Sequence, residues 1–429
     1  MIEGGRLRRA LLGTTATVVL AAALVGVAPT AVAADARSQQ WYLDAMGAED
    51  IWKKATGAGI TVAVIDTGVD PDRPSLKGKV LKGWDAAEAE GDETDDYDGH
   101  GTTIAEVIVG SGAQGGLRGL APDAKVIPYR VSNTELQNEQ AVNAFDVEEA
   151  IKAAADSDAQ IINISMASDY YSEEEREALQ YAQKKGKLVF AGAGNNAQKG
   201  NKKQYPASYP EVVAVAATTQ DGVVANYSQH GEAIDLAAPG SQIPGYCDKS
   251  LTKYCLSDGT SFSSALASAT AALIWSVHPD WTGNQVLRAM FESAGRGDDW
   301  KPGTVSTKAG HGVVRPNAHI NRGIGNPGDP NISPLTNEPT GGAAAGSATP
   351  STAPSATTSE GASTAPSATA STQAPDGKPT SGSAVAGSTE SAASTEDGGG
   401  STGIVIGAVA AVVVLAGAGV VIARKRRTA

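Results

Sequence analysis

The segment "DGTSFSSALAS", residues 258–268, carries four serines behind a glycine and opens a long apolar run. Two interpretations fit a small-residue turn before a helix. Serine and threonine cap helices, so the segment could be purely structural. Alternatively, one serine lies in the first turn, where free backbone N–H groups point outward and a hydroxyl is exposed for chemistry. The rest of the sequence has to decide between them.

Short apolar runs alternate with helical periodicity over residues 57–324. The strand-like runs are Gly59–Asp66, Ala159–Met166, Lys187–Gly194 and Glu211–Thr218, and the helical runs are Asp146–Ser157 and Ser172–Gly186. Strands alternating with helices predict an α/β domain whose mainly parallel sheet is flanked by helices. Functional side chains in such sheets gather at the carboxyl ends of strands. Asp66 and the turn after Gly194 are therefore the places to look.

Three segments together contain the groups that acyl transfer requires. Asp66 ends a strand-like run in "AVIDTGVD", His100 opens a helix-like run in "DGHGTTIAEVIVG", and Ser261 lies in the first segment quoted. A hydroxyl nucleophile needs an imidazole to take its proton and a carboxylate to orient that imidazole. Asn195, in "AGAGNN", is a candidate side-chain donor to the developing oxyanion. Each segment alone is a weak signal, but the three in this order are a strong one.

At these motifs the chain resembles the subtilisin-like serine peptidases. The resemblance extends from about Trp41 to Ala318 and includes "VIDTGVD", "DGHGT", "GLAPDAKVIPYRV", "INIS", "AGAGNN", "LAAPG", "DGTSFSS" and "GHGVVRPNA". It implies the three-layer subtilisin-like fold and hydrolysis of peptide bonds in proteins or peptides. It also implies that Asp66 orients, His100 acts as base and then acid, Ser261 attacks, and Asn195 stabilises the oxyanion.

Two further positions are implied by the same resemblance to bind substrate, namely Ser165 and Ala167 in "SMAS". Many relatives carry glycine at the position of Ala167, so a methyl group there is expected to narrow the pocket for the side chain before the scissile bond. The remaining serines, Ser263, Ser264 and Ser268, are expected to pack the helix. The relatives' usual proline is replaced by Ala265, which bears on rigidity rather than on mechanism.

Both ends of the chain carry targeting signals. Arginines precede an apolar run, and Ala31–Ala33 forms an A-x-A cleavage site, which predicts a secretory signal peptide over residues 1–33. The alternative is an uncleaved anchor. Residues 34–56 are too few for a folded pro-domain, so we expect no autocatalytic pro-domain removal. This arm should instead pack on the peptidase domain through Trp41 and Trp52.

Residues 325–400 are dominated by Gly, Ala, Ser, Thr and Pro and predict a disordered linker. Residues 403–423 carry no charge, and at ~1.5 Å per residue they span about 30 Å, the thickness of a bilayer core. The predicted transmembrane helix covers residues 401–423. The basic residues 424–429 that follow are predicted to be cytoplasmic, which leaves the catalytic domain outside the cell.

This layout resembles that of the mycosins, membrane-anchored peptidases of type VII secretion systems, which implies a secretion complex as a partner. A general cell-surface subtilase is the alternative within the enzyme class. A structural component of a secretion complex with a dispensable triad is the alternative outside it.

The net charge, the cysteines and the acidic residues indicate which partners, covalent links and ligands to expect. The net charge of −13 argues against nucleic acid as a partner. Cys247 and Cys255, the two cysteines of an exported chain, are predicted to form a disulfide. Eight acids between Asp85 and Asp98 are interpreted as a solvated loop, with attraction of basic substrates or a weak calcium site as alternatives. No cofactor is expected to be required, and no metal ligands are assigned.

Overall fold

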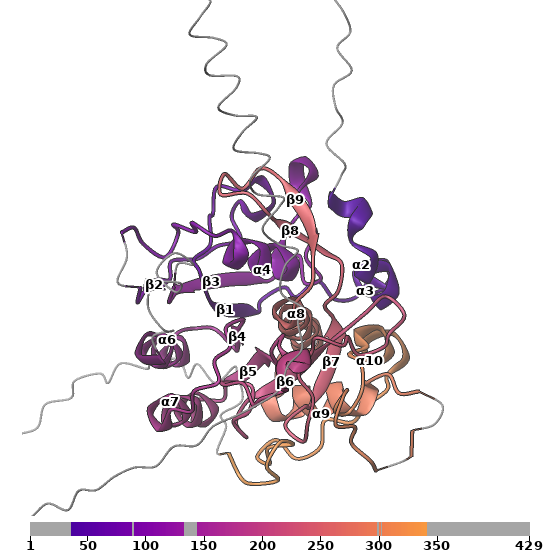
Figure 1. Ribbon diagram of the computed structural model, residues 1–429. Coiled ribbons are helices and arrows are strands. Elements are labelled where there is room, and N and C mark those ends of the chain that lie inside the picture. The colour runs from indigo at the N-terminus through magenta and orange to yellow at the C-terminus, as the bar shows by residue number, and fades with distance from the viewer. Residues whose placement is uncertain (1–35, 88–89, 133–143, 298–299, 302, 341–429) are drawn as a thin grey trace, which may run out of the picture. The chain divides into compact units, whose positions relative to one another are not determined.

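The computed structural model describes residues 36–87, 90–132, 144–297, 300–301 and 303–340 (Figure 1). Seven parallel strands form one sheet within them, in the order β2-β3-β1-β4-β5-β6-β7. Their bounds are β1 Thr61–Asp66, β2 Trp84–Asp85, β3 Lys125–Arg130, β4 Ile161–Ile164, β5 Leu188–Gly192, β6 Val213–Thr218 and β7 Leu236–Pro239. The predicted parallel sheet is confirmed. Each of the four predicted strands is present, although shorter than its apolar run.

Strand β1 lies at the point where the order of the sheet reverses. The chain builds outward from β1 to β3 and β2 on one side, and from β4 to β7 on the other. Such a reversal opens a crevice at the carboxyl ends of the two central strands, and ligands of open α/β sheets bind there. In this chain the crevice lies beyond the ends of β1 and β4.

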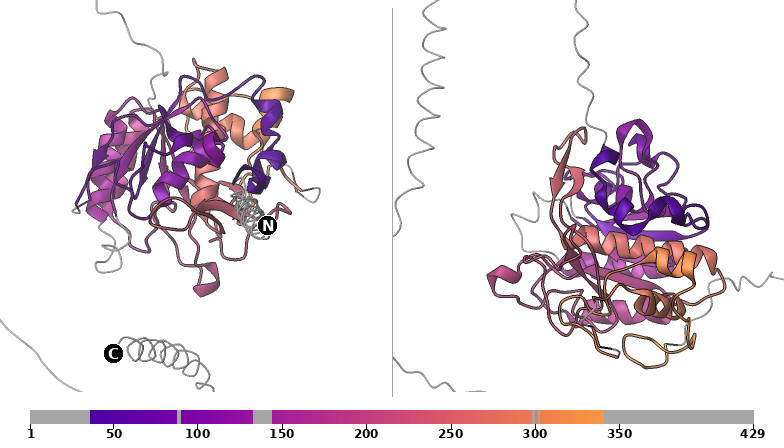
Figure 2. Two further views of the ribbon diagram at one scale, coloured as in Figure 1. Left: turned by 90° about the horizontal axis from the view of Figure 1, so that it is seen from above. Right: turned by 90° about the vertical axis from the view of Figure 1, so that its right-hand side faces the viewer.

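Helices cover both faces of the sheet, which Figure 2 shows nearly edge-on between them in its left view. One face carries α4 (His100–Val109), α8 (Thr260–Val277), α9 (Gly283–Ser293) and α10 (Pro316–Arg322), and the other carries α6 (Ala144–Asp156) and α7 (Glu173–Lys184). Successive side chains of a strand point to opposite faces of the sheet. In β1, Val62 and Val64 therefore pack in one core, and Ala63 and Ile65 pack in the other. Short 3-10 helices cover Ala36–Gln39, Pro74–Leu76, Ala113–Gly115 and Ala197–Lys199.

Helix α8 is the buried helix at the centre of the first core. The expectation for the remaining serines of the opening segment is confirmed. Ser263 donates to the carbonyls of β7 residues Ala238 and Pro239, at 3.1 and 3.2 Å, and Ser268 donates to Asn163 of β4 at 3.1 Å. Among the described residues, α8 is the one helix long and apolar enough to cross a membrane, but 83% of its apolar window is buried in the protein. It is therefore a core helix.

The N-terminal arm lies on this same side of the domain. It forms α2 (Trp41–Met46) and α3 (Ala48–Ile51). The indole nitrogen of Trp41 donates to the Ser241 carbonyl at 3.1 Å, and that of Trp52 donates to the Leu120 carbonyl at 2.8 Å. The Arg118 guanidinium lies 3.8 Å above the Trp52 ring. Both tryptophans thus anchor the arm through a hydrogen bond, and both rings also pack against the hydrophobic core.

A two-stranded hairpin stands apart from the main sheet. Strands β8 (Ile243–Tyr246) and β9 (Tyr254–Ser257) pair antiparallel, and β9 leads within four residues to Ser261. A disulfide joins Cys247 and Cys255 across the hairpin.

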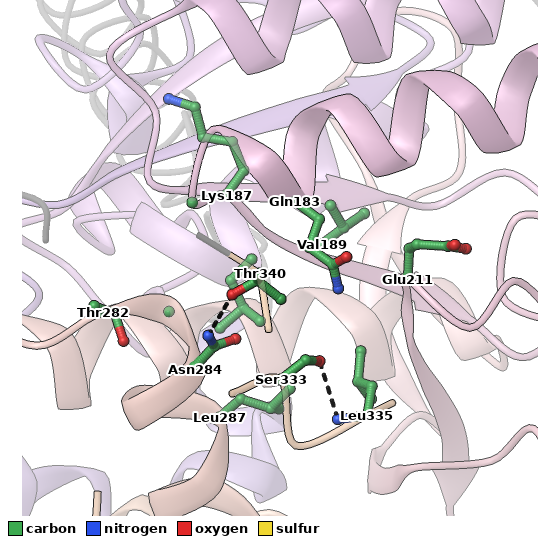
Figure 3. A pocket seen from close by; sticks show the side chains of 13 residues that line it. Gln183, Lys187, Val189, Glu211, Thr282, Asn284, Leu287, Ser333, Leu335 and Thr340 are labelled. Atoms are coloured by element: carbon green, nitrogen blue, oxygen red, sulfur yellow. Dashed lines mark hydrogen bonds between the residues drawn. The ribbon is translucent and has the colours of Figure 1, made fainter. Parts of the chain in front are cut away.

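The C-terminal part of the domain extends beyond the predicted boundary. Residues 326–340, here called the strap, run along α9 and the start of β5 (Figure 3). The Asn284 amide donates to the Pro330 carbonyl at 2.9 Å and to the Thr340 hydroxyl at 2.7 Å. Only a slot of about 20 Å³ remains between the strap and β5. The predicted start of a disordered linker at residue 325 is therefore wrong, because polar contacts from α9 hold a segment whose composition is that of a loop.

The predicted signal peptide, the rest of the linker, the transmembrane segment and the basic tail lie outside the described residues.

Replacing Asn284 with alanine should loosen the strap. Two hydrogen bonds are lost, worth about 0.5–1.5 kcal/mol each, so amide exchange in residues 326–340 should accelerate by at least about fivefold while exchange in β1 and β4 stays unchanged. Hydrogen-exchange mass spectrometry of the full chain measures this. The control is Asn321→Ala, whose amide bonds only Asn317 within α10. Equal protection of the strap in both variants would contradict this assignment.

Candidate active site

The end of β1 and the start of α4 bring two of the predicted residues together. Asp66 is fully buried, and its Oδ1 lies 2.7 Å from His100 Nδ1. The same oxygen accepts the backbone N–H of Thr67 at 2.8 Å. This contact places the proton of the imidazole on Nδ1 and leaves Nε2 free to accept one. The side chain of His100 keeps 32% of its surface exposed.

A third carboxylate, that of Asp96, fixes the start of α4. It accepts five hydrogen bonds at 2.6–3.2 Å, from Thr67 Oγ1, the backbone N–H groups of Asp98, Gly99 and Thr102, and Thr102 Oγ1. Thr67 Oγ1 in turn accepts the Gly101 N–H at 2.9 Å. Asp96 thus caps the helix that begins with His100 and ties it to the loop after β1. Sequence reasoning missed this role. An acid shortly before a helix start is the signal that could have revealed it.

The acidic segment before His100 is only partly the solvated loop that was expected. Asp96 is buried, and Asp85 forms a bidentate ion pair with the fully buried Arg130, at 2.6 and 2.8 Å. Glu93 accepts the backbone N–H of Gly83 at 3.1 Å. Several of these acids therefore hold the loop to the sheet. Among the described residues, no group of three or more His, Cys, Asp or Glu side chains is arranged to hold a metal ion.

Charge dominates the titration of His100. Burial of the ring lowers its pKa, but the charge and hydrogen bond of Asp66 and the charges of Asp98 and Asp96 outweigh this effect and raise the pKa to about 9. The imidazolium is therefore favoured at neutral pH in the unliganded protein.

The candidate nucleophile lies in the first turn of α8, close to the start of α4. Ser261 is the second residue of α8, and the ring centroid of its neighbour Phe262 lies 6.5 Å from that of His100. Among the described residues, Ser261 Oγ donates one hydrogen bond, to the Ser165 carbonyl at 3.3 Å, and none to His100. The structure thus joins Asp66 to His100 and places Ser261 near them, but Ser261 and His100 form no hydrogen bond among the described residues. Such a hydrogen bond is often long before substrate binds.

Asn195 lies beside the nucleophile. Its Oδ1 accepts both the backbone N–H and the hydroxyl of Thr260, each at 2.9 Å, and that hydroxyl accepts the Gly194 N–H at 3.0 Å. The amide is therefore held by its oxygen. In the described part of the chain its nitrogen makes no hydrogen bond and remains available to an anion formed at Ser261. The part played by Thr260 was not predicted.

The two predicted substrate-binding residues follow β4. The hydroxyl of Ser165 accepts from Asn163 Nδ2 at 2.8 Å, so its backbone carbonyl, rather than its side chain, faces Ser261. Ala167 is exposed at the rim. The next residue, Ser168, pairs with Tyr205 through two backbone hydrogen bonds of 2.7 and 2.9 Å. This pairing fixes the path of the rim segment.

Comparison with known proteins agrees with this geometry. The family model described as the Subtilase family matches residues 57–312, well over half of the chain. The chain belongs to the subtilase family. It is 32% identical over 276 residues to thermitase from Thermoactinomyces vulgaris, covering 63% of this chain and 94% of thermitase. It is 36% identical over 226 residues to the thermophilic serine proteinase of Bacillus sp. strain AK1, of which it spans about half, 54%.

Solved structures give the same family. The crystal structure of MycP1 from Mycobacterium smegmatis matches 68% of this subtilase at 29% identity with a TM-score of 0.57, and the match covers 86% of MycP1. MycP3 protease from the type VII (ESX-3) secretion system matches 65% at 28% identity, also with a TM-score of 0.57, over 87% of its chain. The subtilisin-like fold that the motifs indicated and the likeness to mycosins that the layout indicated are confirmed. As a subtilase, the protein is a serine endopeptidase.

The pH dependence of this subtilase should report the acids around His100. A general base must be neutral, so kcat/KM should rise with pH towards an inflection near 9, above the ordinary 6.5 of histidine. Replacing Asp98 with asparagine removes one negative charge that stabilises the imidazolium, so the inflection should move to lower pH. The measurement is a pH profile of peptide hydrolysis. The control is Asp92→Asn in the same segment, whose carboxylate bonds Thr94. An inflection that moves equally in both variants would refute the assignment.

Proposed function

We propose that the chain is a membrane-anchored, extracellular serine endopeptidase that cleaves peptide bonds through an Asp66–His100–Ser261 triad and associates with type VII secretion. The observation that carries the catalytic part is the 2.7 Å contact between Asp66 Oδ1 and His100 Nδ1, together with the 6.5 Å between the ring centroids of His100 and of Phe262, the residue next to Ser261.

Each chemical step has a group of this chain to perform it. Ser261 Oγ turns from the Ser165 carbonyl and attacks the scissile carbonyl, while its proton passes to His100 Nε2. The negative charge on the former carbonyl oxygen is stabilised by the amide nitrogen of Asn195 and by the backbone N–H of Ser261, which has no intrahelical acceptor in the first turn of α8. Asp66 stabilises the imidazolium throughout.

The intermediate then collapses, and His100 donates its proton to the leaving amine. An acyl-enzyme on Ser261 remains. A water molecule, deprotonated by His100, attacks this ester, and the proton returns to Ser261 when the carboxylic acid leaves. The Asn195 amide is already fixed by Thr260, so little reorganisation is required as the charge develops.

The cellular part of the proposal is supported by the sequence layout and by the structural relatives. MycP3 is a protease from a type VII secretion system, and its likeness extends over 65% of this chain. The uncharged segment 403–423 followed by Arg424–Arg427 favours a single membrane span with the peptidase domain outside.

The full chain should react with a fluorophosphonate probe in a Ser261-dependent manner. Wild type should label to about one equivalent, and Ser261→Ala should not label. Asn195→Ala should lower kcat for peptide hydrolysis roughly 10²–10³-fold, the cost of removing one oxyanion donor in subtilisin. Ser264→Ala is the matched control, because its hydroxyl bonds the Ser261 carbonyl within α8. Labelling that persists in Ser261→Ala would refute the assigned nucleophile.

The secretion role predicts a specific pattern of complementation. In a strain that lacks this gene and has lost type VII secretion, the full wild-type chain should restore export. A chain truncated before residue 401 should not, because it lacks the anchor. Type VII export that continues unchanged when the gene is deleted would instead favour a general surface peptidase. Restoration by Ser261→Ala would make the protein a scaffold in that system rather than a processing enzyme.

A further inference from the structure

The β8–β9 hairpin packs against one face of α4, the helix that begins with His100. Gly99, Thr103 and Glu106 lie on this face at positions i, i+4 and i+7. A Cβ on Gly99 would lie 2.6 Å from Leu251 Cδ2 of the hairpin. Thr103 Oγ1 accepts the backbone N–H of Tyr246 at 3.0 Å and donates to the Gly99 carbonyl at 2.7 Å. The hairpin thus contacts the residue directly before His100.

Glu106 is the polar centre of this contact. Its side chain is fully buried. Tyr254 donates to its Oε2 at 2.7 Å, Tyr246 approaches its Oε1 at 3.3 Å, the two hydroxyls lie 2.7 Å apart, and Ser75 donates to Oε1 as well. Burial raises the pKa of Glu106 to about 7 against these hydroxyl donors. The mechanism assigned above makes no use of this buried acid.

The two tyrosines form a cross-strand pair. Tyr246 and Tyr254 face each other in the hairpin register, and their rings stack with centroids 4.5 Å apart. The Cys247–Cys255 disulfide lies next to them and covalently joins the two strands. A contact that fixes the two tyrosine hydroxyls therefore also fixes the position of both strands of the hairpin.

One side of the hairpin borders a cavity and is not closely packed. Hydrogen bonds to α4 therefore help to fix its position. A cavity of about 490 Å³ borders Glu106, Tyr246 and Tyr254, with Arg73 and Lys253 also in its wall. On the cavity side the tyrosine pair is not covered, although Tyr254 also packs against the hydrophobic core. Glu106 is thus the residue of α4 that binds β9, the strand that precedes the nucleophile, while Thr103 binds β8.

We propose that Glu106 is a positioning residue, which sets the distance between His100 and Ser261 by fixing Tyr254 to α4. This rests on the triad proposed above. Ser261 follows the end of β9 by four residues, and Phe262 reaches back to the hairpin, where a Cβ on Gly245 would lie 3.6 Å from its Cζ. Release of Tyr254 allows β9, and with it the first turn of α8, to move relative to the start of α4.

The test compares inactivation by a fluorophosphonate in Glu106→Gln, Glu106→Leu and Tyr254→Phe variants of the full chain. Proton transfer between Ser261 and His100 sets the maximal inactivation rate, whereas probe binding does not need it. Glu106→Leu and Tyr254→Phe should lower the maximal rate by at least about tenfold, since a displacement of about 1 Å costs on the order of 10²-fold. The probe concentration at half-maximal rate should change less than about twofold, and Glu106→Gln, which keeps an acceptor, should recover most of the rate.

Tyr129→Phe is the matched control, because its hydroxyl bonds the Ala153 carbonyl at 3.3 Å in the core on the opposite face of the sheet. It should inactivate like wild type. If folded Tyr254→Phe keeps the wild-type rate, or loses only probe binding, the positioning role is refuted.

Hydrogen exchange keeps the two proposals separable. If wild type and Ser261→Ala behave alike towards the probe, the proposed function fails. The positioning role is then decided by exchange in residues 254–262, which must accelerate in Tyr254→Phe but not in Tyr129→Phe. Equal exchange in both variants overturns it.

Discussion

The buried carboxylate of Asp96 is the contact on which the rest of the site depends. Burial of an ionised carboxyl is costly, and its pKa is accordingly raised. Five hydrogen bonds offset that cost, and they come from the loop after β1, from the residues directly before α4 and from the first turn of α4. Because this one carboxylate binds the loop after β1 and the start of α4 at the same time, it fixes the position of α4 relative to β1. The 2.7 Å contact between Asp66 and His100 follows from that position.

Two opposing effects act on the pKa of His100, and the net result is a raised pKa. An imidazole in a protein crevice loses hydration, which favours the neutral ring, yet three carboxylates within the same loop system favour the charged one. The charged ring is therefore already favoured in the unliganded protein at neutral pH, and the fraction of neutral imidazole increases only as the pH approaches 9. A loop rich in acids, of which some are structural, thus sets the protonation of His100 through its charge.

Local sequence patterns predicted the strands and the helix α8, which are formed by residues close together in the sequence. The β-branched runs before Asp66 and Asn195 became β1 and β5, and the serines that follow Ser261 became packing groups of α8. Two of the features that were missed depend on contacts between residues far apart in the sequence. The anchoring of Asn195 by Thr260 and the contact of Glu106 with Tyr254, 148 positions away, carry no periodicity. The strap was missed for a related reason, since its loop-like composition is overridden by donors on α9. The cap by Asp96 has a local signal, the acid shortly before a helix start, which was not used.

The strap also determines at which edge of the sheet the described residues end. Thr340 lies near Lys187 and Leu188, at the amino-terminal end of β5, whereas Asp66 and Asn195 lie at or beyond the carboxyl ends of their strands. Thr340, the last residue that the structure describes on this side, therefore lies at the edge of the sheet remote from Asp66 and Asn195. The strap and the candidate active site thus occupy opposite edges of the same sheet.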